Sequence, residues 1–585
     1  MSSPGADRAS SDGDGAEAAP SDGVPARSRK RLVAAGLATV LAFLLVLFAV
    51  LSPDNSRGPT PGAFVRLPLE GLVIVALAVL LPARPRKIVA TGIGIALGLL
   101  TIVKLIDLGS FAILSRPYNL VLDWAFLPDG LEFLGTSLGR VGQIGVVVVI
   151  VLLVLAVPTL MSLSVLRLTR IAARHRTGGI RVVAALTVVW IASAVLGVHV
   201  VPGQRFAAKS AVDLTLDRFG RIQDGIHDHT VFAKEAKIDA FANTPPDQLL
   251  TGLRGKDVIL AFVESYGRSA LQDPRYSPGV DAVLDAGTKQ LKADGFAARS
   301  GFLTSPTAGG GSVLAHATLT SALWINNRQR YRNLTTSNRL NLDTAFKKAS
   351  WQTVGVMPGV TEAWPEGAFY QFDKLYAEKD LGYKGPSFGW ATMPDQYTLA
   401  QWQKLKNSGP NHTPTMMEIP LLSSHIPWAP LPTMIPWDQI GDGSVFTAIH
   451  AAGKKSSSVW RHNDDVRAEY GKSIQYSLSA LISYMDKYAD KNTVLVFLGD
   501  HQPVQMVVGK GAGRDVPITI VAKDPAVLDR VSSWNWQDGL RPGPDAPVWK
   551  MSDFRDKFLT AFGPQGATTP AAASAVTASP TATAP

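Results

Sequence analysis

Long apolar runs fill the first third of the chain and constrain its fold more than any other feature. The runs are dominated by Leu, Val, Ile, Ala and Gly, and they occupy residues 32–51, 67–82, 88–114, 141–166 and 182–201. About 20 apolar residues in a helix cross the ~30 Å hydrocarbon core of a bilayer. Each run is therefore a candidate membrane span, although the second is short, and the sequence predicts a five-helix transmembrane domain over residues 29–201.

Basic residues predict which loops face the cytoplasm. One cluster precedes the first run: Arg27, Arg29, Lys30 and Arg31. A second lies between the second and third runs, at Arg84, Arg86 and Lys87. A third lies between the fourth and fifth runs, at Arg167, Arg170, Arg174, Arg176 and Arg181. The positive-inside rule then predicts a cytoplasmic N-terminus and an extracytoplasmic segment from about residue 202. A cleaved signal peptide is the alternative for the first run, which is long for one and precedes no small-residue cleavage site.

Composition divides the remainder of the chain. Residues 1–28 and 565–585 are rich in small and polar residues and are expected to be disordered tails, the first of them cytoplasmic. Residues 202–250 are read as a helical linker. Residues 251–564 alternate short β-type runs with helical stretches, which predicts an α/β domain. Since the clearest basic clusters border apolar runs, the net charge of +10 reflects membrane topology, and no nucleic-acid partner is expected.

The chain contains no cysteine, which excludes disulfides, thiolate metal sites and a cysteine nucleophile. Charged residues are also rare in the apolar runs, where Glu70, Lys104 and Asp107 are found. Charges at such depth usually pair internally or reach the interface, and a substrate path is the alternative reading. A transporter is disfavoured because five helices do not divide into inverted repeats.

Three segments of residues 251–564 carry side chains suited to chemistry. Apolar runs lead to Glu264 and to the pair Asp500-His501, and glycines 309–311 lead into a helix that begins with Ser312. The carboxyl ends of strands form ligand sites in open α/β sheets, and a helix start favours phosphate binding. Taken alone, each of these residues has a simple structural explanation: an acidic residue at a strand end can be solvated, and a serine at a helix start can be an N-cap. Together they offer three oxygens and one nitrogen, a set suited to Mn²⁺, Mg²⁺ or Zn²⁺.

These segments resemble the sulfatase-like branch of the alkaline phosphatase superfamily, and within it the lipoteichoic acid synthases, phosphoglycerol transferases with five membrane helices and an external catalytic domain. The resemblance covers the architecture from about residue 30 and motifs between about residues 257 and 520. It implies an alkaline phosphatase-like α/β/α sandwich with one divalent ion, Mn²⁺ in preference to Mg²⁺ or Zn²⁺. Glu264, Ser312, Asp500 and His501 match the metal ligands of the family, and Ser312 matches its nucleophile.

Two further segments extend the resemblance. Leu421–Trp428 is similar to the family's SSH-x-P motif, which implies proton transfer by His425. Trp364–Tyr370 is similar to a region that lines the glycerol-phosphate pocket, which implies that Trp364 contacts substrate. Glu366 stands where the family carries a phosphate-binding arginine, so the resemblance does not extend to glycerol phosphate itself. The residues after Ser312 lack the proline and arginine that sulfatases need, so sulfate-ester hydrolysis is not expected.

The sequence thus predicts a multi-pass enzyme of the bacterial cell membrane with an extracytoplasmic catalytic domain. It would move a phospho-alcohol group, similar to phosphoglycerol, from a membrane phospholipid donor to a cell-envelope glycan or polymer through a covalent Ser312 intermediate. A phosphodiesterase or phosphatase would use the same side chains with water as the acceptor. A non-catalytic envelope protein that retains the fold is the third reading. His316, His412 and His462 are expected to serve in surface or core packing.

Overall fold

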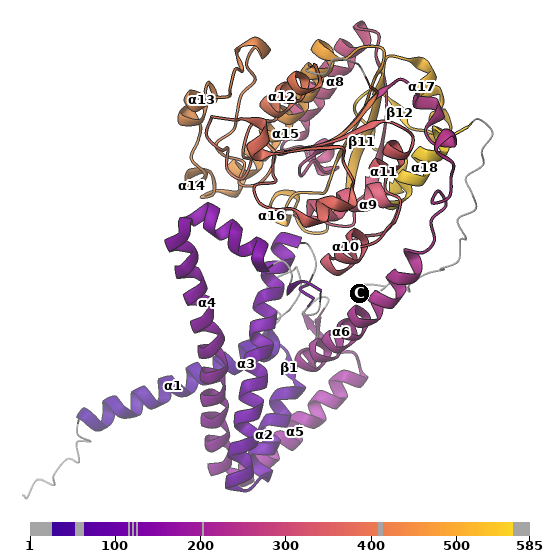
Figure 1. The fold of residues 1–585 in the computed structure, drawn as a ribbon. Coiled ribbons are helices and arrows are strands. Elements are labelled where there is room, and N and C mark those ends of the chain that lie inside the picture. The colour runs from indigo at the N-terminus through magenta and orange to yellow at the C-terminus, as the bar shows by residue number, and fades with distance from the viewer. Residues whose placement is uncertain are drawn as a thin grey trace, which may run out of the picture. The chain divides into compact units, whose positions relative to one another are not determined.

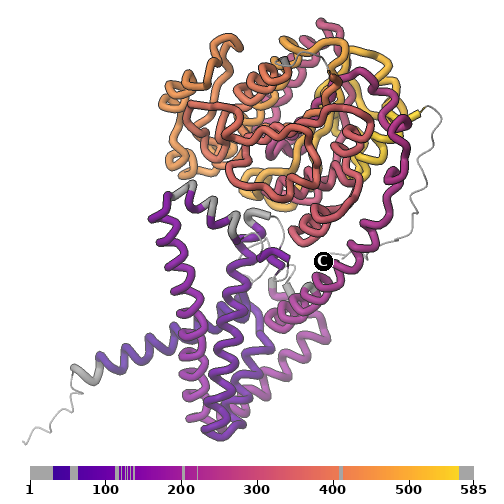
Figure 2. Tube along the Cα trace, viewed as in Figure 1, coloured from indigo at the N-terminus to yellow at the C-terminus, as the bar shows by residue number. Residues whose placement is uncertain are grey.

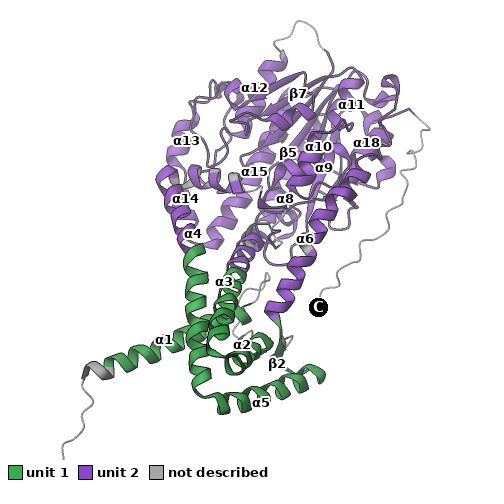
Figure 3. Ribbon diagram, turned by 60° about the horizontal axis from the view of Figure 1, so that its bottom comes forward, with its two compact units in different colours: residues 1–52, 62–101, 154–209 green, residues 53–61, 102–153, 210–585 purple. Residues whose placement is uncertain are grey.

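The structure is a computed structural model that describes residues 26–52, 64–114, 117–119, 122–124, 127–201, 204–407 and 413–564. The chain forms two compact units, coloured separately in Figure 3. The first contains residues 1–52, 62–101 and 154–209, and the second contains the other residues. The predicted tails lie outside the described part of the chain, except that residues 26–28 begin the first helix.

Five helices come first along the chain (Figures 1 and 2): α1 (Ala26–Leu51), α2 (Leu69–Leu80), α3 (Ala83–Leu114), α4 (Leu127–Arg174) and α5 (Arg176–Val195). Four contain a stretch apolar and long enough to cross a membrane: Lys30–Leu51, Ala83–Phe111, Gly139–Arg174 and Arg176–Val195. Helix α2 has 12 residues. At 1.5 Å per residue it is about 18 Å long, which is less than the ~30 Å of a bilayer core. Four of the predicted runs therefore form helices long and apolar enough to cross a membrane, and the total of five spans is not confirmed.

The boundaries of these helices also differ from the expected ones. Helix α5 ends at Val195 rather than at residue 201, because His199–Val201 form strand β2, which pairs with β3 (Gln204–Arg205). Strand β1 (Leu67–Pro68) pairs in the same unit with β4 (Ala207–Ala208). Backbone groups that pair in short strands do not belong to a helical span, so the predicted second run was too long, and the fifth was placed six residues too far along the chain.

Small residues let α3 and α4 pack closely within the first unit. A Cβ atom on Gly94 would lie 2.3 Å from the Cα atom of Ser162, and one on Gly98 would lie 2.4 Å from the Cα atom of Pro158. Glycines four residues apart share one helix face, and such pairs allow close contact of membrane helices, where lipid offers no hydrophobic drive for association.

Asp107, one of the charged residues in the apolar runs, forms a salt bridge within the second unit. Arg218, on helix α6 (Ser210–Glu235), forms a salt bridge with the buried Asp107 of α3. Arg218 also donates a hydrogen bond of 2.6 Å to the carbonyl oxygen of Tyr118. Lys104 is buried as well. The internal ion pair expected for such residues is therefore present at Asp107.

The second unit is built on a nine-stranded sheet in the order β12-β6-β11-β10-β5-β9-β7-β8, with β13 also paired to β6. Its strands are β5 (Asp257–Val263), β6 (Ala297–Thr304), β7 (Gln352–Met357), β8 (Lys374–Ala377), β9 (Thr415–Leu421), β10 (Thr493–Gly499), β11 (Asp515–Ala522), β12 (Gln537–Asp538) and β13 (Val548–Lys550). The central strands β10, β5, β9, β7 and β8 run parallel. All residues of β5 and β10 are buried, as their apolar sequences predict.

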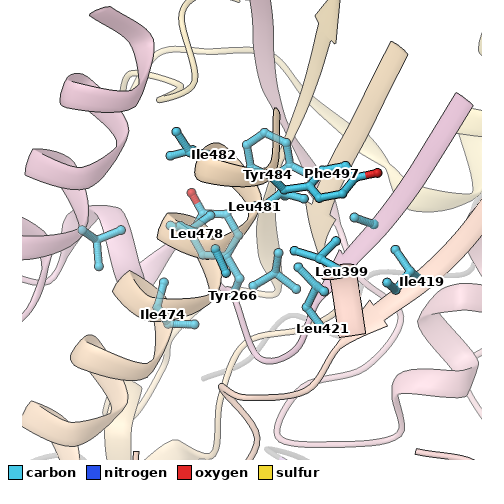
Figure 4. Close-up of a cluster of buried hydrophobic side chains, with 14 of the residues drawn as sticks. Tyr266, Leu399, Ile419, Leu421, Ile474, Leu478, Leu481, Ile482, Tyr484 and Phe497 are labelled. Atoms are coloured by element: carbon cyan, nitrogen blue, oxygen red, sulfur yellow. The ribbon is translucent and has the colours of Figure 1, made fainter. Parts of the chain in front are cut away.

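Helices cover both faces of this sheet. Ile259, Ala261 and Val263 of β5 pack in one core with α8 (Ser277–Ala293), α12 (Asp395–Asn407) and α15 (Asn463–Tyr488). Figure 4 shows Ile474 and Leu478 of α15 in this core, with Ile419, Leu421 and Phe497 of the neighbouring strands. The alternate residues of β5 face a second core with α9 (Ser312–Ser321), α11 (Leu342–Lys348) and α18 (Phe554–Ala561). These three layers confirm the predicted α/β domain.

Candidate active site

Two parallel strands deliver three of the expected side chains to one edge of the sheet. Strands β5 and β10 pair in register, with Gly499 opposite Val263, so Glu264 and Asp500 are the next residues of adjacent strands. Gly499 leaves the room that this requires, because a Cβ atom there would lie 1.8 Å from the carbonyl oxygen of Tyr266. The carboxylate of Asp500 is held by the backbone N–H groups of Ser265 and His501, which donate to Oδ1 at 2.8 and 2.7 Å.

The glycine run places Ser312 beside these residues. Gly309 and Gly311 have φ values of 74° and 80°, in the left-handed region that favours glycine. The Gly309 N–H donates a hydrogen bond of 2.7 Å to the carbonyl oxygen of Gln502, which ties the loop to the residues after β10. Gly311, rather than Ser312, is the N-cap of α9. The hydroxyl of Ser312 is therefore not used to cap the helix.

The four side chains expected at the metal converge. Ser312 Oγ donates to Glu264 Oε2 at 2.9 Å and lies 3.2 Å from His501 Nε2. One ligand atom each from Glu264, Asp500 and His501 lie within 4.8 Å of one another, and all three residues are buried. His501 Nδ1 lies 2.9 Å from the carbonyl oxygen of Gln502, which can only accept, so Nδ1 carries the proton and Nε2 presents its lone pair to the cluster.

The electrostatics of the cluster fit a bound cation. Burial raises the pKa of Asp500 to about 7, and the adjacent Glu264 carboxylate adds to the shift. Burial would also raise the pKa of Glu264, but His501 and His425, with hydrogen bonds from Asp500 and Ser265, lower it to about 2. None of the described residues lining the cavity here is Lys or Arg. Two buried carboxylates with no fixed cation need a proton or a metal ion to offset their repulsion, so these donors fit a divalent ion.

His425 lines the same cavity as Ser312. It follows strand β9, and the hydroxyl of its neighbour Ser424 donates to the backbone oxygen of Glu264 at 2.6 Å. Its Nδ1 donates to the carbonyl oxygen of Ile426 at 2.6 Å, which leaves the Nε2 lone pair available. The ring stacks on Trp390 at 4.3 Å. Burial lowers the pKa of His425, against an opposing effect of Glu264, so the imidazole is held neutral and able to accept a proton.

A cavity of about 220 Å³ brings these residues together with further ones. Trp364 lines it, and so do Ser312, His425, Glu264 and Asp500, whereas Glu366 is not among its lining residues. The apolar part of the wall is formed by Phe262, Val313, Met357, Val360, Trp390 and Leu422. The cavity therefore joins a polar end at Ser312 to a largely apolar and aromatic enclosure.

His316 and Glu418 also line the cavity, and sequence reasoning assigned neither to the site. His316 is buried, as a packing residue would be, and it stacks on Phe262. Its position four residues after Ser312 places both on one face of α9, which was a usable signal. Glu418 interrupts the apolar strand β9, and an acidic residue inside such a strand is the second missed signal. His462 is exposed, and His412 lies outside the described residues.

The fold and the site together define a class: an α/β domain with a serine hydroxyl at a helix start, next to a buried cluster of Glu, Asp and His that fits a divalent ion. No protein-family model matches the chain, and no curated protein matches it.

Solved structures with some likeness include the lipoteichoic acid synthase LtaP from Listeria monocytogenes, at 14% identity and a TM-score of 0.35 over 58% of this chain and 79% of that chain. The phosphoglycerol transferase GacH from Streptococcus pyogenes, in complex with sn-glycerol-1-phosphate, is similar at 15% identity and a TM-score of 0.34, over 56% of this chain and 78% of its own. The C-terminal periplasmic domain of EcEptC from Escherichia coli, also solved with Zn, has 14% identity and a TM-score of 0.35, over 53% and 82%. The function proposed below rests on the geometry of the site.

Proposed function

We propose that this chain is a membrane-bound phosphotransferase that moves a phospho-alcohol group from a phospholipid donor to a cell-envelope glycan or polymer through a covalent Ser312 intermediate. The observation that carries the proposal is the position of Ser312 Oγ, 2.9 Å from Glu264 Oε2 and 3.2 Å from His501 Nε2, in a cavity with room for a substrate group. A serine hydroxyl is a weak nucleophile unless neighbouring groups activate it, and these two are placed to do so.

In the first half-reaction, Ser312 Oγ attacks the phosphorus of the lipid phosphodiester. The Oγ–P bond forms, the bond from phosphorus to the diacylglycerol oxygen breaks, and the phospho-alcohol stays on Ser312. Ser312 loses one proton, and the departing diacylglycerol oxygen gains one. His425 is the residue we assign to this transfer, because its other nitrogen is held by Ile426 and its Nε2 lone pair is available. Nε2 accepts the proton of Ser312 and passes it to the departing oxygen, so the imidazole is neutral again at the end of the step.

In the second half-reaction, a hydroxyl group of the acceptor attacks the same phosphorus, and Ser312 leaves with a proton. The neutral His425 accepts the proton of the attacking hydroxyl and passes it to the departing Ser312 Oγ, so the imidazole is again neutral at the end. The aromatic wall around Trp364 excludes water from the intermediate while the acceptor enters, so that transfer is favoured over hydrolysis.

A divalent ion held by Glu264, Asp500, His501 and Ser312, which we take to be Mn²⁺, would lower the pKa of the serine hydroxyl and offset negative charge on the phosphate. Backbone groups hold two of these side chains in place: the N–H groups of Ser265 and His501 donate to Asp500, and the carbonyl oxygen of Gln502 accepts from His501 Nδ1.

The domain limits and membrane orientation form part of the same proposal. We place the transmembrane domain at residues 29–201, a linker at 202–250 and the catalytic domain at 251–564, outside the cytoplasm, with the N-terminus inside. The four helices that are long and apolar enough to cross a membrane support attachment to the bacterial cell membrane, which would give the catalytic domain access to a lipid donor.

The test is mass spectrometry of the full-length protein, purified in detergent, incubated with Mn²⁺ and single phospholipids, and quenched in acid. The expected result is one added phospho-alcohol on the peptide that contains Ser312, with release of diacylglycerol. A Ser312→Ala variant of the same melting temperature should show neither. If diacylglycerol forms without an adduct, or if Ser312→Ala forms it at the wild-type rate, a covalent serine mechanism is wrong.

A second incubation separates the transferase from the hydrolase that uses the same residues. With a glycan acceptor present, a transferase yields a phosphorylated glycan, and the free phospho-alcohol declines. A phosphodiesterase yields free phospho-alcohol at the same rate whether or not the acceptor is present. A folded protein that binds Mn²⁺ but turns over no lipid would support the non-catalytic reading instead.

A further inference from the structure

Three ionisable side chains form a buried chain beside the cavity, which His316 and Glu418 line, and the mechanism above uses none of them. His316 Nδ1 lies 3.1 Å from Glu418 Oε1. The carboxyl groups of Glu418 and Asp343 interact with each other. Glu418 is 1% exposed and Asp343 is fully buried. We refer to Asp343, Glu418 and His316 as the acid–imidazole chain.

Each member comes from a different element around the nucleophile. Asp343 lies in the first turn of α11, Glu418 lies in β9, and His316 lies one turn after Ser312 in α9. Glu418 pairs in register with Leu260 of β5, so it points to the same side of the sheet as Phe262 and Glu264. The His316 ring lies flat on Phe262, with 3.6 Å between ring centroids, and this contact fixes its plane.

The carboxyl groups of the acid–imidazole chain have few hydrogen-bond donors around them. Glu418 Oε2 and both carboxyl oxygens of Asp343 are buried and receive no N–H or hydroxyl donor from the described residues. A contact between two carboxyl groups requires at least one proton between them. Burial raises the pKa of Glu418 to about 8, and burial together with the neighbouring Glu418 raises the pKa of Asp343 well above its usual value. Burial lowers the pKa of His316 to about 4. All three groups are therefore uncharged near neutral pH.

In this arrangement His316 Nε2 can act either as a hydrogen-bond donor or as an acceptor. When Nδ1 donates to Glu418, Nε2 accepts a hydrogen bond, and when protonated Glu418 donates to Nδ1, Nε2 donates one. Among the residues that the structure describes, no hydrogen-bond partner is found for Nε2, although His316 and Glu418 both line the cavity. A group that can both donate and accept complements a hydroxyl group, which does the same.

We propose that His316, held by Glu418 and Asp343, determines the specificity of the enzyme by binding an uncharged hydroxyl group of the alcohol that is transferred. This inference rests on the proposed function, since it names the part of the substrate that enters the cavity beyond Ser312. An ammonium group only donates, so it can match His316 Nε2 in one of its two roles and not in the other. An alkyl group would leave Nε2 without a partner.

The test compares three probes that differ in one terminal group: 2-hydroxyethyl phosphate, 2-aminoethyl phosphate and ethyl phosphate. Binding to the full-length, Mn²⁺-loaded protein is measured by calorimetry in a Ser312→Ala background, which prevents turnover. The hydroxyl probe is expected to bind about tenfold more tightly than either of the others, the ratio that one net hydrogen bond provides. Equal binding of the three probes, no binding of any, or a preference for the amine would overturn the proposal.

Two variants assign this preference to the acid–imidazole chain. His316→Phe keeps the stack on Phe262 and removes both nitrogens, so the hydroxyl and ethyl probes should bind alike. Glu418→Gln keeps the volume and cannot share a proton with Asp343 in the same way, so the preference should shrink. Glu366→Gln is the matched control, because Glu366 does not line the cavity, and it should retain the full preference.

Melting temperature and Mn²⁺ affinity, measured for each variant, separate a local effect from misfolding. If His316→Phe does not fold, the probe ranking of the parent protein and of Glu418→Gln decides the matter. A preference for the hydroxyl probe that survives in both folded variants contradicts the role of His316. Failure of the proposed function has a different signature, which is the absence of any adduct on Ser312 of the wild-type protein with every lipid donor.

Discussion

The hydroxyl of Ser312 donates a hydrogen bond of 2.9 Å to Glu264, although 48 residues separate the two in sequence. Strand β5 ends at Val263, and helix α9 begins at Ser312, so the contact joins the end of a central strand to the start of a helix on one face of the sheet. A nucleophile placed in this way meets both the free N–H groups of a helix start and the ligands of a metal site.

Replacement of Ser312 distinguishes a nucleophile from a metal ligand. Ser312→Thr keeps the hydroxyl and adds one methyl group, so we expect an adduct and a turnover within about tenfold of wild type. Ser312→Ala removes the nucleophile and should reduce turnover by about 10⁴-fold or more. Diacylglycerol release from a labelled lipid measures both. Equal loss in the two variants, with Mn²⁺ affinity unchanged, would show that packing at this position matters more than the hydroxyl.

Asp500→Asn should abolish the stabilisation of the protein by Mn²⁺. The ion binds only the folded site, so it should stabilise the wild type by about 2.7 kcal/mol at a hundredfold excess over its Kd. The amide is a weaker ligand and carries no charge, so the melting temperature of the variant should no longer rise with Mn²⁺. Without metal, the variant should melt no lower than the wild type, because the repulsion between Asp500 and Glu264 is gone. Asp515→Asn, at a carboxylate that pairs with Arg268 on the surface, is the control and should respond to Mn²⁺ as wild type does.

Metal affinity should depend on pH in a predictable direction. Burial and then Glu264 raise the pKa of Asp500 to about 7 in the metal-free site, so this carboxyl group holds a proton below that pH. The ion must displace the proton, and its affinity should therefore fall about tenfold for each pH unit below 7 and level off above it. Calorimetric titration with Mn²⁺ in buffers of different ionisation enthalpy measures the affinity and the proton released. An affinity that does not change between about pH 5.5 and about pH 7 would contradict this assignment.

Gly499→Ala should destabilise the catalytic domain by about 3 kcal/mol or more, because the new Cβ atom meets backbone and no flexible side chain. That atom would lie 1.8 Å from the carbonyl oxygen of Tyr266. Relief of the clash would move Asp500, so Mn²⁺ affinity should fall as well. Gly513→Ala is the control, since nothing lies within 4 Å of its Cβ position and its φ is not positive. Chemical denaturation of both variants measures the difference, and similar midpoints would show that the β5–β10 edge can relax.

Much of the architecture was readable from residues 30 to 201 and from three short motifs. Apolar length alone predicts a membrane helix, because every backbone group of a span must be satisfied within its own helix. The same reasoning overestimated the run at residues 67–82, where Pro68 and Pro82 flank α2 and limit it to Leu69–Leu80. Length and composition do not show at which residue a helix ends. The sequence therefore predicts that membrane helices are present better than it predicts how many there are.

The sequence by itself determined the types of residue at the strand ends: Glu264 after an apolar run, Asp500 and His501 after another, and Ser312 after three glycines. Local patterns carry this information because strand, turn and helix start are set by neighbouring residues. Only the tertiary structure decided that β5 and β10 are adjacent and in register, which puts the two carboxylates within reach of one ion. It also decided that His316, Glu418 and Asp343, from a helix, a strand and another helix, come together beside a cavity that the first two line. Contacts between elements distant in sequence depend on how layers stack on a sheet, and no local pattern of residues encodes them.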